Sequence, residues 1–220
     1  MRQHADSAYV PALRFHWLTS YYDALIGATT RERRFKRALI AQARFAQGQR
    51  VLDLGCGTGT LAIWIKQDHP QALVTGIDGD PAIVFLASKK ARQAHVSAQF
   101  IRALSYSLPY PPKAFDRVVS SLLFHHLSWA DKTRTALEAF RVLKPGGELH
   151  VADWGRPTNP AMRILFGTIQ VLDGFANTQD NVSGKLATLF AEAGFRDVAQ
   201  RQTFNTMFGT LALYSGVKPR

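Results

Sequence analysis

The sequence predicts an α/β fold in which a doubly wound, mostly parallel seven-stranded sheet is covered by helices on both faces. Three observations lead to this expectation. Short apolar runs and helical patterns alternate between residues 50 and 153, which is typical of parallel strands joined by crossover helices. Hydrophobic residues make up 46% of the 220 positions, enough to bury a large core. Glycine and proline separate the predicted elements.

The elements follow from local signals in chain order. Residues 7–46 have aromatic and aliphatic side chains every four positions, which predicts helix. Asp80 before Pro81 is typical of a helix start, and Gly194 of a helix end. We expect strands at 50–55, 72–78, 98–102, 115–121, 148–153, 195–204 and 209–216, and helices at 59–68, 81–94, 131–143, 160–172 and 182–193. The turn 144–147 should precede the fifth strand.

The expected organisation is a helical N-terminal cap at 1–47 and one domain at 48–220, with a helical insert at about 155–193. Residues 48–220 show one continuous strand-helix pattern without internal repeats, so we expect a single domain there. Substrate selection should belong to the cap and the insert, because both lie over the strand ends.

The net charge of +11 is distributed unevenly. Residues 1–50 carry nine cationic and three anionic side chains, and five of the cations fall within residues 31–37. Such a run is either a solvated helix face or a surface for a phosphate, an anionic membrane or an acidic substrate. It places the basicity beside the substrate-facing cap.

The single cysteine, Cys56, cannot form an internal disulfide, and the N-terminus lacks an apolar secretory core. Both features favour a reducing, cytoplasmic location. The apolar stretch 162–172 is too short to cross a bilayer. Contact with the inner membrane face would therefore be peripheral.

The most informative stretch is a strand that ends in alternating glycines, Gly55, Gly57 and Gly59, and turns directly into a helix. Such a loop brings backbone N–H groups close to a ligand. Asp53, two residues before the first glycine, would repel a pyrophosphate but would suit a ligand that carries a cation, such as an α-amino group. The alternative is a buried Asp53 bonded to loop amides.

The second acidic position is Asp78, at the end of the second predicted strand and 23 residues after Gly55. A carboxylate at this place can accept hydrogen bonds from ribose hydroxyls. Asp80 is better explained as a helix N-cap.

These segments and four later ones resemble the class I S-adenosylmethionine-dependent methyltransferases, and within them the bacterial branch of ubiquinone and menaquinone C-methyltransferases. The resemblance covers about residues 48–154. Its segments are VLDLGCGTG (51–59), GID (76–78), LPY (108–110), FDRVVSS (115–121), HHL (125–127) and AFRVLKPGGEL (139–149). It implies a Rossmann-like methyltransferase fold with S-adenosyl-L-methionine as cofactor.

The resemblance also implies roles for individual residues. The expected cofactor-binding set is Asp53, Gly55, Cys56, Gly57, Thr58, Gly59, Asp78, Gly79, Leu104, Ser105, Ser121, Leu122 and Tyr22. Asp53 and the glycine loop would hold the methionine end, Asp78 the ribose, and the backbone of Ser121 and Leu122 the α-amino group. The chain departs from the pattern after the third strand, where residues 100–106 offer no carboxylate for adenine. Ser105 or a main-chain carbonyl would substitute.

Methyl transfer to an atom that bears a proton needs a general base, and histidine suits neutral pH. His125 and His126 follow the fourth strand. We favour His126 over His125 as a catalytic residue; the alternative is that one ring packs against the sheet edge and the other binds a carbonyl. No Cys/His cluster has metal-ligand spacing.

The leading functional hypothesis is methylation of a small, lipid-soluble or amphipathic acceptor such as a quinone precursor or a phospholipid head group. Apolar residues in the insert, among them Trp154 and Phe166, would form a lid or simply pack. The alternatives are an RNA methyltransferase or nucleic-acid binder, favoured by charge alone, and a protein that binds S-adenosylmethionine without catalysis.

Overall fold

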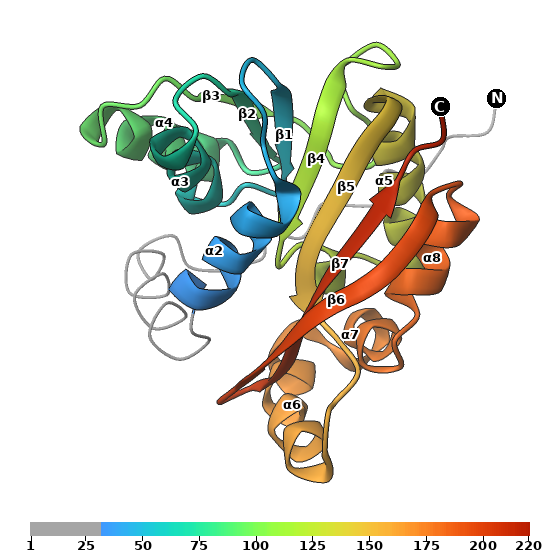
Figure 1. The fold of residues 1–220 in the computed structure, drawn as a ribbon. Coiled ribbons are helices and arrows are strands. Elements are labelled where there is room, and N and C mark those ends of the chain that lie inside the picture. The colour runs from blue at the N-terminus through green and yellow to red at the C-terminus, as the bar shows by residue number, and fades with distance from the viewer. Residues whose placement is uncertain (1–31) are drawn as a thin grey trace, which may run out of the picture.

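The structure, a computed structural model, describes residues 32–220, apart from the side chains of Leu172 and Asp173. A twisted sheet runs through the centre and helices cover both faces (Figure 1). The described elements are α2 (Glu32–Ala43), β1 (Arg50–Leu54), α3 (Thr60–Asp68), β2 (Leu73–Asp78), α4 (Pro81–Gln93), β3 (Gln99–Arg102), β4 (Phe115–Ser121), the 3-10 helix η2 (Phe124–His126), α5 (Trp129–Val142), β5 (Leu143–Trp154), α6 (Pro160–Asp173), α7 (Phe175–Val182), α8 (Leu186–Glu192), β6 (Arg196–Thr206) and β7 (Gly209–Val217).

The seven strands lie in the order β3-β2-β1-β4-β5-β7-β6. The first five are parallel, and β7 is antiparallel to both β5 and β6. The predicted doubly wound, mostly parallel seven-stranded sheet is therefore confirmed. The strand order reverses between β1 and β4, and in such sheets ligands bind in the crevice beyond the carboxyl ends of the strands at this point.

Two apolar clusters fill the spaces above and below the sheet. One joins α5 and α8 to the sheet, and the other joins α2, α3 and α6 to its opposite face. In α2 the buried residues are Phe35, Leu39, Ile40 and Ala43, whose spacing gives one apolar face. The described part of the expected N-terminal cap thus packs into the core. Residues 7–31 of the predicted helix lie outside the described residues.

Two predicted caps are confirmed. The Asp80 side chain accepts a hydrogen bond from the Ala82 N–H at 2.8 Å at the start of α4. Gly194, with a φ of 105°, follows α8, and its N–H donates to the Ala191 carbonyl while that of Phe195 donates to the Phe190 carbonyl. A left-handed glycine with these two bonds ends a helix in a Schellman motif.

The helix predicted at 182–193 is wrong in extent. Only α8 lies in this region, and it begins at Leu186. Val182 is the last residue of the preceding helix, α7, and a turn at Gly184, where φ is 80°, separates the two helices. The α7 sequence, FANTQDNV, is largely polar, so it gave no apolar period from which a helix could be predicted.

The turn predicted at 144–147 lies instead within β5, which begins at Leu143. Lys218 explains the longer strand, because its carbonyl accepts from the Gly146 N–H and its N–H donates to the Gly147 carbonyl. The C-terminal segment therefore extends the sheet along the two glycines.

Candidate functional site

The glycine loop connects β1 to α3 at the crevice of the sheet. Gly55, Gly57 and Gly59 all have positive φ, at 64°, 53° and 79°. A Cβ on Gly55 would lie 2.7 Å from a Leu123 methyl carbon, so glycine is required there by packing as well. Among the described residues, no atom lies within 4 Å of a Cβ built on Gly57. The middle of the loop therefore borders open space that a ligand could fill.

Asp53 lies in β1 directly before this loop and is only 1% exposed. Neither carboxylate oxygen has a hydrogen-bond partner among the described residues. Burial raises the pKa of Asp53 to about 7; Lys36 and the Ala62 backbone oppose this shift, and Asp78 adds to it. The alternative in which loop amides hold Asp53 is thus not observed. A buried carboxylate in this condition suits a ligand that brings a positive charge.

Asp78 ends β2 beside the loop. Its Oδ2 accepts from the Gly57 N–H at 3.1 Å, and its Oδ1 from the Asp80 N–H at 3.0 Å. Burial raises its pKa, although these backbone bonds partly offset the effect. Each carboxylate oxygen has two lone pairs, so Asp78 keeps acceptor capacity for hydroxyl groups. The neighbouring Gly79 accepts from Arg102 through its carbonyl.

The two other loop residues, Cys56 and Thr58, make different contacts. The Cys56 N–H donates to the Ile77 carbonyl at 2.8 Å, and burial raises the pKa of its thiol well above the usual range. Cys56 therefore offers the site backbone and not a reactive thiolate. The Thr58 hydroxyl lies 3.4 Å from the Lys90 ammonium on α4.

Leu104 and Ser105 follow β3, where the sequence lacks the expected carboxylate. The Ser105 hydroxyl is buried and lies 2.9 Å from that of Thr135 on α5. The Leu104 carbonyl accepts from the Ser107 N–H. The preceding residue, Ala103, donates its N–H to the Asp78 carbonyl at 3.0 Å. This bond places the segment with Leu104 and Ser105 beside the end of β2.

At the end of β4, Leu122 has a φ of 59°, a left-handed conformation that costs a leucine about 1–2 kcal/mol. Its N–H donates to the Ala152 carbonyl at 2.8 Å, which holds the turn in place. The buried Ser121 hydroxyl has no partner among the described residues. Strain of this kind is concentrated at functional sites.

The two histidines are the last two residues of η2, which follows this turn. His125 Nδ1 lies 2.9 Å from Asp153 Oδ1, and the His126 ring is tilted against the His125 ring at 3.9 Å between centroids. Burial, together with the neighbouring His125, lowers the pKa of His126 well below the usual range. Burial thus favours the neutral form of the His126 ring.

Asp153 is a site residue that the sequence analysis missed. It is fully buried in β5 and also accepts from the Phe124 and Trp154 N–H groups and from the Asn181 amide. The available signal was an acidic residue ending an apolar strand on the same sheet edge as Asp53 and Asp78. Its bonds fix both the position and the ring orientation of His125.

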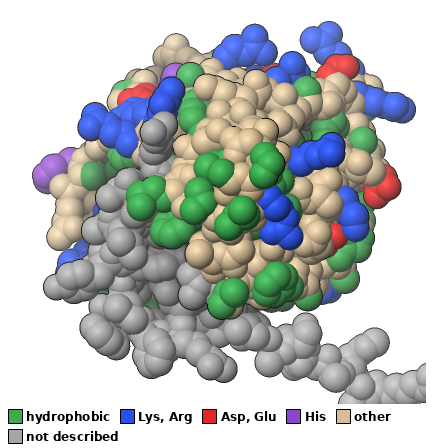
Figure 2. Space-filling view, turned by 90° about the horizontal axis from the view of Figure 1, so that it is seen from below, with side chains coloured by type: hydrophobic (Ala, Val, Ile, Leu, Met, Phe, Trp, Pro, Cys, Tyr) green, Lys and Arg blue, Asp and Glu red, His purple; other side chains and the backbone are tan. Residues whose placement is uncertain are grey.

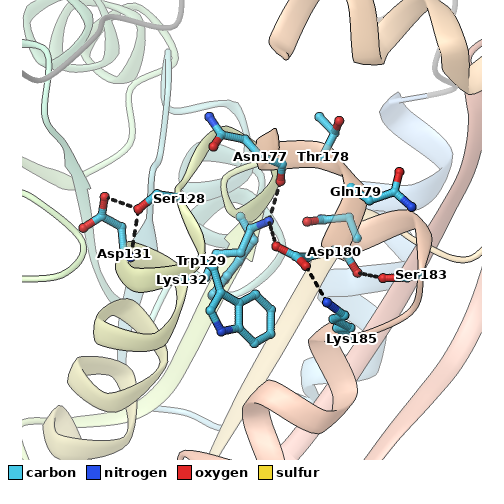
Figure 3. A network of polar contacts seen from close by, with 12 residues as sticks. Ser128, Trp129, Asp131, Lys132, Asn177, Thr178, Gln179, Asp180, Ser183 and Lys185 are labelled. Atoms are coloured by element: carbon cyan, nitrogen blue, oxygen red, sulfur yellow. Dashed lines mark hydrogen bonds and ion pairs between the residues drawn. The ribbon is translucent and has the colours of Figure 1, made fainter. Parts of the chain in front are cut away.

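Helix α7 is fastened next to the histidines by α5 (Figure 3). The buried Lys132 ammonium donates to the Asn177 carbonyl and lies 3.8 Å from Asp180. The Asn177 amide donates to the His126 carbonyl at 3.3 Å. Asp180 also pairs with Lys185 at 3.0 Å. These contacts place the insert beside the ends of β4 and β5.

Two of the four described cations of the basic run have acidic partners. Lys36 pairs with Glu32, and Arg37 pairs with Asp68 and lies over the Trp64 ring at 5.1 Å. Arg31 and Tyr22 lie outside the described residues. Within residues 32–220 no helix has the length and apolar content to cross a membrane.

Comparison with known proteins identifies relatives of the chain. Residues 51–147 match the family model of a methyltransferase domain. A demethylmenaquinone methyltransferase of Lactiplantibacillus plantarum is 30% identical over 207 residues, covering 84% of this chain and 85% of that protein. A demethylmenaquinone methyltransferase of Thermus thermophilus is 34% identical over 133 residues, and the match spans 60% of each protein.

A solved structure with a similar fold is the [4+2]-cyclase SpnF, with a TM-score of 0.69. The two chains are 22% identical, and the match covers 84% of this chain and 81% of the cyclase. This likeness concerns the fold, which supports different chemistries through different sites.

Proposed function

This chain belongs to the class I S-adenosylmethionine-dependent methyltransferases, and on that premise we propose that it methylates a small acceptor of apolar or amphipathic character. The observation that carries the proposal is Asp53, a buried carboxylate without a described partner beside a glycine loop that borders open space. A zwitterionic amino-acid end fits both features, because its amino group can pair with the carboxylate and its carboxylate can meet the loop N–H groups.

S-adenosylmethionine supplies an activated methyl group on a positively charged sulfur. We assign its amino-acid end to Asp53 and the loop of Gly55, Gly57 and Gly59. The ribose hydroxyls are assigned to Asp78, which has acceptor capacity left after its two backbone bonds. Backbone at 104–105 and at 121–122 would complete the site. Tyr22 stays a prediction.

For an acceptor that loses a proton, we propose His125 as the general base and not the initially favoured His126. Asp153 accepts from Nδ1–H of His125 at 2.9 Å, which leaves Nε2 as the basic nitrogen of the neutral ring. Asp153 and Asn181 are then positioning residues.

The relatives support an apolar acceptor, because their names concern menaquinone biosynthesis. Helix α6 also has exposed apolar side chains, with Ile164 77% and Val171 74% exposed. It lies at the lower end of the molecule in Figure 1, and the face seen from below shows hydrophobic and cationic side chains side by side with few acidic ones (Figure 2). We propose peripheral contact between this face and an anionic membrane.

Transfer of a labelled methyl group from S-adenosylmethionine to a bacterial lipid extract tests the acceptor class. We expect label in the fraction that partitions into hexane, as a prenylated quinone would. Label that appears only in added RNA would support the nucleic-acid alternative, which the relatives do not favour. Binding of S-adenosylmethionine without transfer to any extract would support the non-catalytic alternative.

The base is tested with His125→Asn, for which we expect about a hundredfold lower kcat and an unchanged affinity for S-adenosylmethionine. His126→Asn is the matched control, since its ring is adjacent but has no contact with Asp153 among the described bonds. Equal kcat values for the two variants would remove the proposed role of His125.

A further inference from the structure

A pocket of about 440 Å³ lies among the loop after β5, the start of α6 and the end of α7. Its polar lining consists of Arg156, Asn159, Arg163, Gln179 and Ser183. None of the described residues that line it is acidic. Two guanidinium groups thus share one concave surface without a compensating carboxylate.

Arg156 sits on a loop that is held firmly. The Gly155 N–H donates to the Thr210 carbonyl at 2.9 Å, and the Thr158 hydroxyl donates to Asn205 at 2.8 Å. Arg156 itself has no ion pair among the described residues. The backbone of this arginine is fixed while its charge stays available.

Arg163 is the first donor in a chain of hydrogen bonds, and its chemistry fixes which atom donates and which accepts in each bond. Arg163 can only donate, and it donates to Gln170 Oε1 at 2.8 Å. Gln170 therefore presents its amide nitrogen to Gln179 Oε1, at 3.2 Å. The Gln179 amide nitrogen is consequently left to donate into the pocket, which Gln179 lines.

Asn159 adds a further donor by the same reasoning. Its Oδ1 caps α6 by accepting from the Met162 N–H at 3.0 Å, so its amide nitrogen stays available. The start of α6 contributes the positive end of the helix dipole. The pocket therefore combines two cationic side chains, of which Arg163 is held by Gln170, with amide donors and suits an anion.

We propose that this pocket binds a phosphate group, either free or in a lipid head group. Guanidinium groups bind phosphate through paired hydrogen bonds, and two of them match its charge. The exposed Ile164 follows Arg163 directly, so an apolar surface adjoins the cationic one. This site is separate from the transfer site, because α7 lies between them and its Asn181 bonds Asp153.

The test compares inorganic phosphate binding by calorimetry at low ionic strength in three proteins. R156Q/R163Q should raise the dissociation constant at least tenfold over the wild type. R92Q/R196Q removes two exposed charges elsewhere and should stay within twofold. R156Q alone keeps the Arg163–Gln170 bond and should raise the dissociation constant at least threefold, which guards against misfolding of the double variant.

Equal affinities in R156Q/R163Q and R92Q/R196Q, or no saturable phosphate binding by the wild type, would overturn the proposal. Cosedimentation with phosphatidylcholine vesicles, with and without phosphatidylglycerol, separates the sources. A lipid head group predicts that R156Q/R163Q lowers retention on the anionic vesicles more than R92Q/R196Q. Free phosphate predicts equal retention for both pairs with the calorimetric difference preserved. S-adenosylmethionine binding should be unchanged in every variant.

Discussion

The buried carboxylate of Asp53 makes the stability of the protein depend on pH. Its pKa of about 7 in the folded chain lies above the ordinary 3.8, so the folded state binds more protons than the unfolded state between these values. This residue therefore lowers the free energy of unfolding as pH rises from about 4 to 7, by on the order of 1 kcal/mol per pH unit.

Asp53→Asn should remove this dependence. Urea unfolding of both proteins between pH 4.5 and 7.5 should show the variant gaining stability relative to the wild type as pH rises. Saturating S-adenosylmethionine should reduce the difference, because a bound cation favours the ionised carboxylate. Parallel stability curves without ligand would mean that Asp53 is not desolvated in the folded chain.

A substitution at Gly57 tests two effects separately: the cost of a side chain at positive φ and the loss of space for the ligand. Gly57→Ala should cost about 1–2 kcal/mol because φ is 53°. The variant should still fold, because its Cβ meets no atom of residues 32–220 within 4 Å. The added methyl group would occupy the space assigned to the cofactor, so we expect at least tenfold weaker S-adenosylmethionine binding by calorimetry.

Gly48→Ala is the matched control for this substitution. Gly48 also has a positive φ and open surroundings, but it precedes β1 at the opposite edge of the sheet. It should lose similar stability and retain full affinity. The account of the loop fails if both variants bind S-adenosylmethionine equally well.

At the scale of elements, α7 depends on one buried cation. The Lys132 side chain is 0% exposed and burial lowers its pKa, yet it holds Asn177 and Asp180 of α7. Lys132→Met leaves the half-buried Asn177 carbonyl without this donor and removes one of the two cations that pair with Asp180. We expect a loss of about 1–3 kcal/mol in the free energy of unfolding, with faster amide hydrogen exchange at 175–182.

Lys185→Met provides the comparison, because Lys185 pairs with the same Asp180 but is 57% exposed. An exposed pair contributes at most about 1 kcal/mol. If Lys132→Met destabilises the protein no more than Lys185→Met, then Lys132 does not anchor α7.

The elements that the sequence predicted well are those with an internal signal. The strands of the parallel sheet are continuous apolar runs, and Asp80 and Gly194 mark helix ends through their own backbone chemistry. Helix α7 had no such signal, because tertiary contacts from Lys132 and Asp153 hold its polar sequence in place. Its existence depends on residues that are distant in the chain.

At the scale of the whole molecule, one part of the site follows from local sequence and another part follows from tertiary packing. The glycine loop, Asp53 and Asp78 could be predicted, because backbone geometry and charge restrict which residues occur there. The pairing of His125 with Asp153, and the pocket of Arg156 and Arg163, could not be predicted. Each joins residues that only the packing of the insert on the sheet brings together.

The structure also changes the interpretation of the positive net charge. The run at 31–37 suggested a basic surface, but Lys36 and Arg37 are paired with Glu32 and Asp68. Arg33 and Arg34 of that run are exposed and have no acidic partner among the described ion pairs. Arg156 and Arg163 also have none, and they differ from the run in lining one pocket together. The proposed anion-binding surface therefore lies near α6.

Calorimetric titration of S-adenosylmethionine into the wild type and Asp53→Asn at pH 7.5 tests the central claim most directly. The account predicts one saturable site per chain in the wild type and at least tenfold weaker binding in Asp53→Asn, since the variant keeps the shape of the site and removes only its charge. Equal affinity of the two proteins, or the absence of saturable binding by the wild type, would contradict it.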